Sequence, residues 1–355
     1  MNLRKILLNS VLVLFFCAIG LAVVEMGARL MLGAPKQTAG VLFFSAEVFQ
    51  NTSTGTVRFS PGREFRAISV FGDEVEFDVR FKTNNLGLVD QQNYPLAENP
   101  RNIAIVGDSF TAGYHGGDPW VAGLRGKVEN ANFYNLGITG AGFVQFDRLQ
   151  SDLAGKLGLS ETLIVAISSD VKRKPWRTVK HEGRLFFCAT ETETSDCLKQ
   201  NSSVYTLDGN ETEADIFATA KAHTEKYQKP GLRRYLSRHT HVGKIFHSRT
   251  WRKRSKKLDV EPVAEIAVNA LKHMKNRLGN SLTLLHLPER REVEAGTYST
   301  DLKTLAESLN IRFVSGLKTC EMSAGDYYPR DSHPNQTGYG KIQNCVANIL
   351  NTVKN

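Results

Sequence analysis

Beyond residue 101 the chain alternates short apolar runs with segments of helical spacing. The apolar runs predict buried strands at 103–106, 133–136, 163–167, 282–287 and 311–314. Between the second and third runs, Phe143, Phe146, Leu149 and Leu153 recur at the spacing of one helix face, and similar faces accompany the later runs. Strands that alternate with helices favour right-handed crossovers and a parallel sheet, so the pattern predicts an α/β fold.

Two segments break this alternation. Within residues 34–100, Val75, Phe77, Val79 and Phe81 alternate with polar residues, which predicts a half-buried strand in a β-containing lead-in. A second break runs from about 181 to 260, where the apolar residues between 232 and 246 recur at helical spacing. We therefore expect a domain over 101–355 that carries a mainly helical insertion.

The first apolar stretch of the chain, from Ile6 to Val24, contains no charged residue. At about 1.5 Å per residue, a helix of this length nearly covers the ~30 Å hydrocarbon core of a membrane. Arg4 and Lys5 precede it, which leaves the N-terminus in the cytoplasm by the positive-inside rule. A cleaved signal peptide is the alternative, but no small-residue cleavage site follows the stretch. We expect residues 1–33 to be a single-pass anchor, with the rest of the chain periplasmic or extracellular.

Composition supports a folded protein and reveals a basic segment. The 355 residues are 41% hydrophobic and 23% charged, which excludes a mostly disordered chain. Lys and Arg total 45 against 36 Asp and Glu, and twelve of the basic residues lie from Lys226 to Lys257 with no acidic residue among them. The segment 226–257 is either a solvated face or a platform for anionic lipid or anionic glycan. Nucleic acid is disfavoured as a partner, because the anchor places this segment outside the cytoplasm.

The cysteines fit an oxidising compartment. Cys17 lies in the apolar stretch, and four cysteines remain outside it. One pairing joins Cys188 to Cys197 and Cys320 to Cys345, although four cysteines allow three pairings. Cys345 also falls on the apolar face of the last predicted helix, where a buried thiol would pack. Two disulfides are favoured, with their pairing left open.

Two short motifs carry the residue types of nucleophilic catalysis. Gly-Asp-Ser at 107–109 ends the first strand of the predicted sheet, where a hydroxyl projects into the crevice at the strand carboxyl ends. Asp-Ser-His at 331–333 precedes the last helix, whose dipole favours a neutral imidazole. A serine needs a base, and the base needs a carboxylate to fix its tautomer. Each motif alone is typical of turns and caps. Together they offer a candidate for each part, with Ser109 as the hydroxyl, His333 as the base and Asp331 as the carboxylate.

Acyl chemistry also needs hydrogen-bond donors that converge on a negatively charged oxygen. The second strand ends at Gly137, and Ser168, Ser169 and Asp170 follow the third. We expect the backbone N–H groups of Ser109 and Gly137, with a polar side chain from the end of the third strand, to supply these donors. Gly137 taken alone is equally typical of a plain strand-to-helix turn.

Taken together, these residues resemble the SGNH/GDSL hydrolase family, through Gly-Asp-Ser at 107–109, Asn-Leu-Gly at 135–137 and Asp-Ser-His-Pro-Asn at 331–335. The resemblance covers roughly 101–180 and 260–355, and residues 80–87 are similar to what precedes the nucleophile in membrane-tethered members. It implies a three-layer α/β/α sandwich with a mostly parallel sheet. It also implies Ser109 as nucleophile and oxyanion donor, Gly137 as a second donor and His333 as general base.

The chain departs from the family pattern in two places. The third block usually carries an Asn donor, but Ser169 occupies that position here, and losing one oxyanion donor can lower a rate by about 10²–10³-fold. The usual Asp-x-x-His spacing is also altered, since position 330 is Arg and the acid is Asp331. Asp331 then either orients the imidazole, which we favour, or leaves His333 as half of a dyad.

By this resemblance we expect a membrane-anchored serine esterase that acts on O-acyl esters, of acetyl type, in envelope carbohydrate or lipid. One alternative is an O-acyltransferase that modifies extracytoplasmic glycan. Another, motivated by Ser169, is a catalytically weakened polysaccharide-binding module. No cofactor is implied, and no Cys and His spacing in the sequence indicates a metal site.

Overall fold

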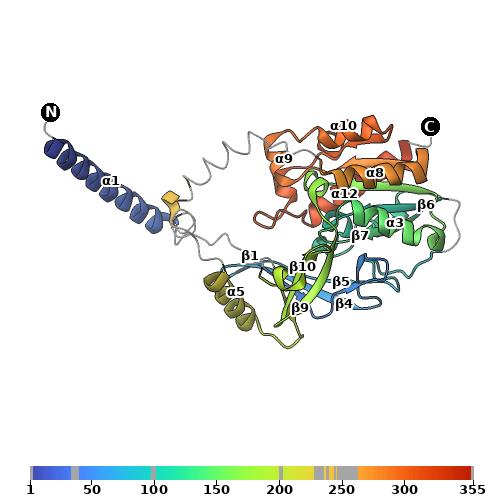
Figure 1. Cartoon of the computed structure of the whole chain (residues 1–355), viewed down its shortest axis with the longest axis horizontal. Coiled ribbons are helices and arrows are strands. Elements are labelled where there is room, and N and C mark those ends of the chain that lie inside the picture. The colour runs from blue at the N-terminus through green and yellow to red at the C-terminus, as the bar shows by residue number, and fades with distance from the viewer. Residues whose placement is uncertain are drawn as a thin grey trace.

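The computed structural model describes residues 3–32, 40–96, 101–199, 203–227, 236, 240–243, 245 and 263–352. Helix α1 (Leu3–Leu32) projects away from the rest of the chain, which is built around two sheets (Figure 1). The helix continues past Val24, the predicted end of the apolar stretch. Its part from Asn9 to Leu32 is long and apolar enough to cross a membrane, a test that a signal sequence also passes.

The sheet of the α/β domain has five strands in the order β13-β12-β8-β6-β7. All of its pairings are parallel. Each predicted strand is present within a residue or two of its expected bounds, so the α/β fold with a mostly parallel sheet is confirmed. The strands are β6 (Asn102–Gly107), β7 (Asn132–Gly137), β8 (Glu161–Ala166), β12 (Leu282–His286) and β13 (Arg312–Ser315).

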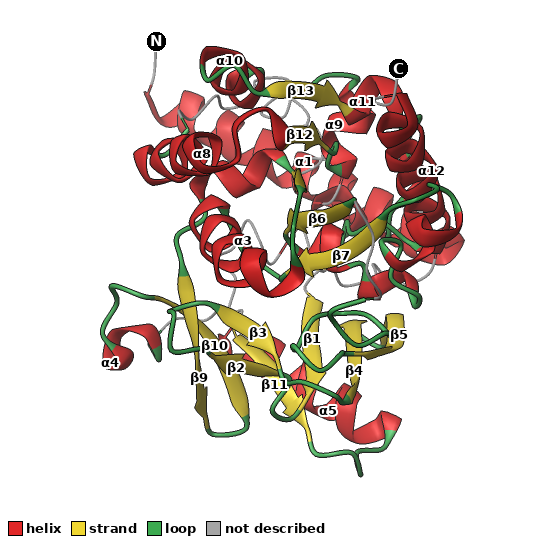
Figure 2. Cartoon of the chain, turned by 90° about the vertical axis from the view of Figure 1, so that its right-hand side faces the viewer, coloured by secondary structure: helices red, strands yellow, loops and turns green. Residues whose placement is uncertain are grey.

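Helices cover both faces of this sheet and give three layers. Helices α3 (Phe143–Leu157) and α8 (Glu265–Leu278) lie on one face, and α12 (Gln336–Thr352) lies on the other (Figure 2). The pleat of the strands divides their side chains between the two layers. Ala104 and Val106 belong to the core beneath α3 and α8, whereas Ile103 and Ile105 belong to the core beneath α12. Strands buried on both faces form continuous apolar runs, which is why the sequence predicted them.

Short elements follow the strands at their carboxyl ends or join the longer helices. Helix α2 directly follows β6, and the 3-10 turn η3 follows β8, so both begin at the same edge of the sheet. These elements are α2 (Ser109–Ala112), α9 (Arg290–Ala295), α10 (Asp301–Ser308), α11 (Gly316–Thr319), η1 (Tyr114–Gly116), η2 (Ala122–Gly126), η3 (Ser168–Lys172), η4 (Gly279–Ser281) and η5 (Ala324–Asp326).

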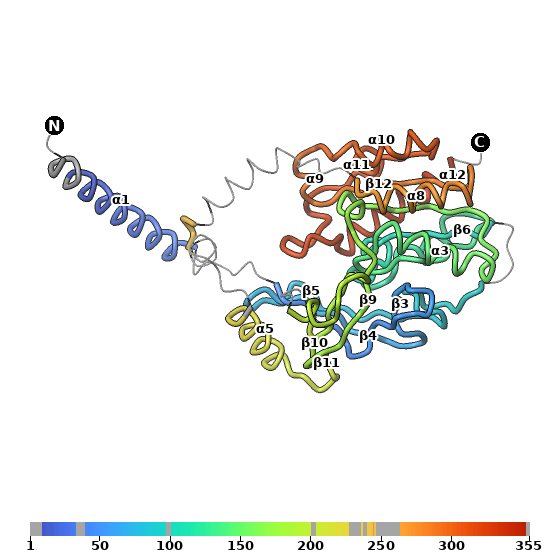
Figure 3. The backbone as a smooth tube through the Cα atoms, viewed as in Figure 1, coloured from blue at the N-terminus to red at the C-terminus, as the bar shows by residue number. Residues whose placement is uncertain are grey.

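A second sheet joins the lead-in to the insertion. Its six strands run in the order β5-β4-β1-β11-β10-β9, and β1 pairs with β11 in parallel, so segments far apart in the sequence lie side by side (Figure 3). The lead-in supplies β1 (Gly40–Ser45), β4 (Glu64–Phe71) and β5 (Glu74–Lys82), and β5 is the strand predicted by the alternation at 75–81. The chain after β8 supplies β9 (Trp176–His181), β10 (Arg184–Ala189) and β11 (Ser203–Leu207). A separate hairpin is formed by β2 (Phe49–Asn51) and β3 (Val57–Phe59).

The second sheet is covered on one face by α5 (Glu213–Tyr227), whose Ile216 and Ala220 join the same buried cluster as Val41 of β1. Its other face packs on the α/β domain, where the rings of Phe44 and Phe81 contact Tyr114 of η1. The second sheet therefore lies against the edge of the α/β domain at which α2 begins.

The insertion was expected to be mainly helical. Its described part contains α4 (Thr194–Cys197) and α5, but also β10 and β11, which the sequence did not predict. These strands are stabilised by pairing with β1 of the lead-in, a partner that no local pattern identifies. The basic segment 226–257 lies mostly outside the described residues, so its expected anionic lipid or glycan ligand stays a prediction.

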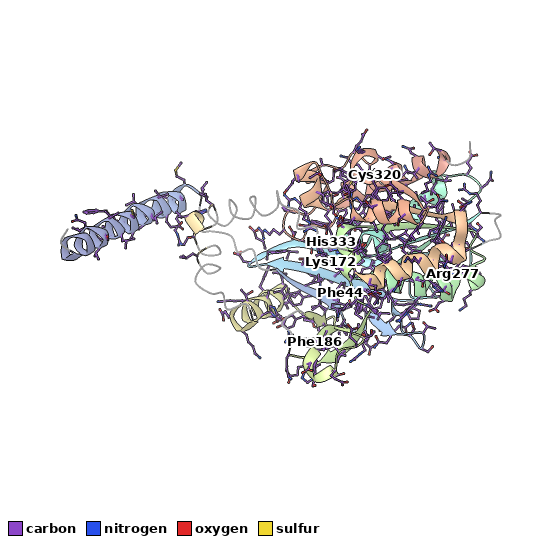
Figure 4. The ribbon with its side chains drawn as sticks, turned by 45° about the horizontal axis from the view of Figure 1, so that its top comes forward. Phe44, Lys172, Phe186, Arg277, Cys320 and His333 are labelled. Carbon is purple, nitrogen blue, oxygen red and sulfur yellow. A yellow bond between two sulfur atoms is a disulfide. The ribbon has the colours of Figure 1, made fainter. Side chains whose placement is uncertain are left out.

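Both disulfides follow the pairing considered from the sequence. Cys188 bonds to Cys197, and Cys320 bonds to Cys345, so the buried-thiol alternative for Cys345 is wrong. Cys17 of α1 is a free thiol. The second bond ties the end of α11 to α12, in the C-terminal part of the chain where Figure 4 labels Cys320 and His333.

Candidate active site

The carboxyl edge of the parallel sheet brings two distant segments together. After β6 ends, the Asp108 side chain accepts the Phe110 N–H at 2.9 Å and caps α2, whose first residue is Ser109. Ser109 Oγ lies 2.8 Å from Nε2 of His333, although 224 positions separate the two residues. Ser109 is buried and His333 is half-buried, which limits the access of water to the contact.

A tight loop before α12 carries the imidazole and the carboxylate. Tyr328 N–H donates to His333 O at 2.9 Å, and Ser332 N–H donates to Tyr328 O at 3.1 Å. Ser332 has a φ of 70°, in the left-handed region that few residues other than glycine adopt. This turn lets Asp331 Oδ1 hydrogen bond with His333 Nδ1 across a single intervening residue. The altered spacing therefore still places Ser109, His333 and Asp331 in the order of a triad.

Asp331 and His333 shift each other's pKa. Burial is the largest influence and opposes a charged imidazole, but the charge and hydrogen bond of Asp331 and the charge of Asp108 together raise the pKa of His333 above its ordinary value. Burial also acts to raise the pKa of Asp331, but the nearby imidazole and its hydrogen bonds hold that pKa well below its usual range. An ionised Asp331 that accepts the Nδ1–H leaves Nε2 of the neutral ring free to accept the Ser109 proton.

A second imidazole stacks on the first. The rings of His115 and His333 are nearly parallel, with centroids 3.8 Å apart, and the edge of Phe77 encloses His115 from another side. Burial, and then the nearness of His333, lower the pKa of His115 well below its ordinary value, so this neighbour is neutral.

Among the described residues, this cluster offers the most side-chain ligand atoms for a metal ion. His115, Asp331 and His333 each offer one ligand atom, and these atoms lie within 4.8 Å of one another. The two rings are stacked, so their nitrogen lone pairs run side by side, and His333 Nδ1 is already bonded to Asp331. This arrangement suits proton transfer better than metal coordination, and the expectation of a metal-free site stays a prediction.

Strand β5 of the second sheet holds the loop that carries Asp331 and His333 from outside. The two carboxylate oxygens of Glu76 accept the Arg330 N–H at 2.7 Å and the Asp331 N–H at 2.8 Å. Glu74 pairs with the Arg330 guanidinium. The sequence reasoning missed both glutamates, because the lead-in pattern indicates only a strand and nothing local connects it to position 330. The lead-in is thus a structural part of the candidate site.

Replacing Glu76 with Ala is expected to lower kcat for ester hydrolysis by about 10–100-fold with little change in KM. Two hydrogen bonds to a charged acceptor are lost, and the turn that aligns Asp331 with His333 is freed. The matched control is Glu64→Ala on the adjacent strand β4, since the ion pairs of Glu64 with Arg80 and Lys82 are exposed. Steady-state kinetics with p-nitrophenyl acetate compare the two variants, and equal activities would remove the role given to Glu76.

The two backbone N–H groups predicted as oxyanion donors differ in whether they already have a hydrogen-bond acceptor. Ser109 N–H opens α2, where first-turn amides have no acceptor within the helix. Gly137 N–H already donates to Asn135 Oδ1 at 3.0 Å, because the buried Asn side chain turns back to the amide two residues on. This amide can serve a substrate only by sharing its hydrogen. A side chain at 137 would meet the Ala112 nitrogen at 2.1 Å, which explains the glycine.

Ser169 lies in η3 and contacts an arginine that sequence reasoning did not single out. Arg173 Nη2 donates to Ser169 Oγ at 3.2 Å, and Arg173 Nη1 donates to Asp108 Oδ2 at 2.7 Å. Nη1 also lies 2.7 Å from Asp170 Oδ1, as an ion pair without hydrogen-bond alignment. The one local signal for this arginine is its position three residues after Asp170, a spacing at which opposite charges pair on a helical turn.

A pocket of about 430 Å³ opens beside this arginine. Trp176 forms part of its wall and donates from Nε1 to Gly140 O at 3.0 Å, which ties the loop after β7 to the chain after β8. Ser109 and His333 do not line the pocket, but Arg173, which does, donates to Asp108, the residue that precedes Ser109. Its lining residues are Thr139, Gly140, Arg173, Lys174, Trp176, Phe187 and Ala189.

Comparison with known proteins gives partial structural likenesses. No family model matches the sequence, and no curated protein matches it. A lipase/acylhydrolase from Enterococcus faecalis is 13% identical with a TM-score of 0.34, and the match covers 70% of this chain and 95% of that one. An esterase active on acetylated mannans is 15% identical with a TM-score of 0.37, over 72% of this chain and 50% of that one. A psychrotrophic esterase from Pseudoalteromonas sp. is 13% identical with a TM-score of 0.35, and the match covers 72% of this chain and 100% of that one.

Proposed function

We propose that the chain is a membrane-anchored serine esterase that cleaves O-acyl esters, of acetyl type, on envelope carbohydrate or lipid. The proposal rests on the contact at 2.8 Å between Ser109 Oγ and His333 Nε2, with Asp331 bonded to the other ring nitrogen. A hydroxyl, an imidazole and an ionised carboxylate in this order form the arrangement by which a serine attacks an acyl carbon.

In the first half-reaction, Ser109 Oγ forms a bond to the carbonyl carbon and its proton moves to His333 Nε2. The carbonyl electron pair moves to oxygen, which becomes the oxyanion. When that pair returns, the bond to the alcohol oxygen breaks, and the alcohol leaves with the proton from His333. In the second half-reaction, His333 takes a proton from water as the water oxygen bonds to the acyl carbon. The bond from that carbon to Ser109 Oγ then breaks, the carboxylic acid leaves, and Ser109 Oγ takes the proton back from His333.

Helix α1 is the proposed anchor, with the N-terminus in the cytoplasm and both sheets in the periplasm or outside the cell. Its apolar length supports a membrane span, and the two disulfides support an oxidising compartment. Tethering in this way keeps the site close to acylated components of the envelope.

The proposed substrate-binding region is the pocket beside Arg173. Its volume of about 430 Å³ falls in the range of small-molecule sites, roughly 300–1,000 Å³. Trp176 and Phe187 give it an aromatic wall next to polar groups, a combination suited to an acylated sugar or a lipid headgroup. A pocket of this size also admits a sugar hydroxyl in place of water, so an O-acyltransferase is the second candidate.

The test follows the fate of the acetyl group. The full-length chain in detergent is given p-nitrophenyl acetate, either in water alone or with mannopentaose or pectate oligomers as acceptors. The esterase proposal predicts that the yield of free acetate equals the yield of nitrophenol even when either oligosaccharide is present. It also predicts that both products are lost in Ser109→Ala. Acetyl groups found on the oligosaccharide would mean that a sugar hydroxyl, rather than water, accepts the acyl group, and would favour the transferase. Nitrophenol release that is absent throughout would favour a binding module, whereas release that survives in Ser109→Ala would mean that another group attacks the ester.

A further inference from the structure

The site as described is short of oxyanion donors. The amide side chain expected after β8 is replaced by Ser169, and the Gly137 N–H is already engaged by Asn135. A serine hydroxyl rotates about its C–O bond, so it is a useful donor only when a neighbour fixes its direction. The question is therefore what orients Ser169.

Arg173 makes that contact. Its Nη2 donates to Ser169 Oγ at 3.2 Å, which occupies an acceptor site of the hydroxyl. The Ser169 hydrogen has no acceptor among the residues that the structure describes, so it is available to a bound substrate. A hydroxyl whose oxygen accepts from a guanidinium is polarised toward donating its own hydrogen.

The same guanidinium also reaches the nucleophile's surroundings. Arg173 Nη1 donates at 2.7 Å to Asp108 Oδ2, and Ser109 Oγ lies 3.4 Å from that same oxygen. Ser169, Arg173, Asp108 and Ser109 thus form one continuous chain of polar contacts. The charge of Arg173 also acts on His333, and it works to lower the pKa of that imidazole. The positive charge therefore lies close to where negative charge develops on the substrate.

The loop that carries Ser169 is fixed from its far side. Ser168 donates to Glu292 Oε1 at 2.5 Å and lies 2.9 Å from His286 Nε2, and both partners are fully buried. Asp170 Oδ2 accepts the Ile167 N–H at 3.0 Å. Since Glu292 contacts the serine rather than the far ring nitrogen of His286, this cluster is not a second triad. It holds the start of η3 in place, and the Ser169 hydroxyl is then directed by Arg173.

We propose that Arg173 is a positioning residue that orients and polarises the Ser169 hydroxyl, so that this cation-backed hydroxyl replaces the missing amide in the oxyanion hole. The inference rests on the proposed function, because it assigns a donor to the tetrahedral intermediate formed at Ser109. Arg173 acts through Ser169 and through its charge, while Ser169 touches the oxyanion.

The test uses the full-length chain in detergent and two readouts. One is kcat and KM for p-nitrophenyl acetate. The other is the rate of inactivation by a fluorophosphonate, in which the Ser109 Oγ–P bond forms, the P–F bond breaks, fluoride leaves and the proton passes to His333. Ser169→Ala should lower kcat and the inactivation rate by about 100-fold with little change in KM, as for loss of one oxyanion donor.

Arg173→Lys keeps the charge beside Asp108 but loses the fork that spans Asp108 and Ser169. It should lower kcat about as much as Ser169→Ala, and the double variant should lose no more than either single variant. Ser169→Asn supplies its own amide donor, so in that background Arg173→Lys should cost less than 10-fold in kcat. Lys199→Gln, which breaks an exposed pair with Asp196, is the surface control and should leave both readouts unchanged.

A purely structural Arg173 predicts different results. Its loss would then multiply with Ser169→Ala, would not be rescued by Ser169→Asn, and would lower the thermal midpoint in every background. Any of these results overturns the inference, as does an unchanged inactivation rate in Ser169→Ala. Failure of the proposed function looks different, because the wild-type chain would then form no Ser109 adduct at all.

Discussion

Ser109→Ala is expected to lower kcat for p-nitrophenyl acetate hydrolysis by about 10⁶-fold, close to the rate without enzyme. The reason is that the acyl-enzyme forms at the Ser109 oxygen, and among the residues that the structure describes no other hydroxyl lies at 2.8 Å from His333 Nε2. The substitution removes one atom from a buried position at the start of α2, so the fold should persist. Initial rates and the thermal midpoint of the full-length chain are compared with the wild type.

Ser151→Ala is the matched control, because Ser151 lies exposed on α3 and contacts no residue of the site. It should leave both rate and midpoint unchanged. Substantial hydrolysis by Ser109→Ala, with the fold intact, would mean that another group attacks the ester and that the contact with His333 is not the catalytic one.

Asp331→Asn is expected to lower kcat by about 10⁴-fold, because an amide no longer fixes the imidazole tautomer or stabilises its charged form. It should also change the pH profile. In the wild type, Asp331 raises the pKa of His333, so hydrolysis rises as pH increases through that raised pKa and the ring becomes neutral. Removing the carboxylate should move the inflection to lower pH. The groups that face the imidazole in the variant are then Asp108, Arg173 and the neutral His115.

The pH dependence of stability should run the other way. A raised folded pKa for His333 means that its proton stabilises the native chain, fully below the unfolded value of about 6.5 and progressively less as pH rises through the folded pKa. The wild type should therefore lose this increment of stability over the pH range in which it gains activity, and Asp331→Asn should lose less. Rate–pH profiles and unfolding midpoints measured over the same range check both signs. An inflection that stays in place in Asp331→Asn would contradict the assignment of Asp331.

The parallel sheet was predictable because its strands are buried on both faces and therefore appear as continuous apolar runs. The residues brought together at its edge were predictable for a related reason. Ser109 follows the end of β6 after one residue, and the loop with His333 precedes α12, so local patterns placed each at a strand end or helix start. A parallel sheet then gathers its carboxyl ends at one edge.

The second sheet and the residues that support the site were not predictable in this way. Strand β11 is stabilised by pairing with β1, and Glu76 by the backbone of the loop that holds Asp331, so neither role leaves a local pattern. Arg173 was visible only as a charge three residues from Asp170. Its importance depends on Asp108, which belongs to a different strand end. Such roles come from tertiary contacts between segments, which hydrophobic periodicity does not report.

The most direct measurement locates the covalent adduct formed when the folded, full-length wild-type chain reacts with a fluorophosphonate. The account predicts a single added phosphonyl group, mapped by peptide mass spectrometry to Ser109, and no adduct in His333→Ala under the same conditions. A folded chain that stays unmodified, or one that carries the group on a different serine, would contradict the claim that Ser109 and His333 act together as nucleophile and base.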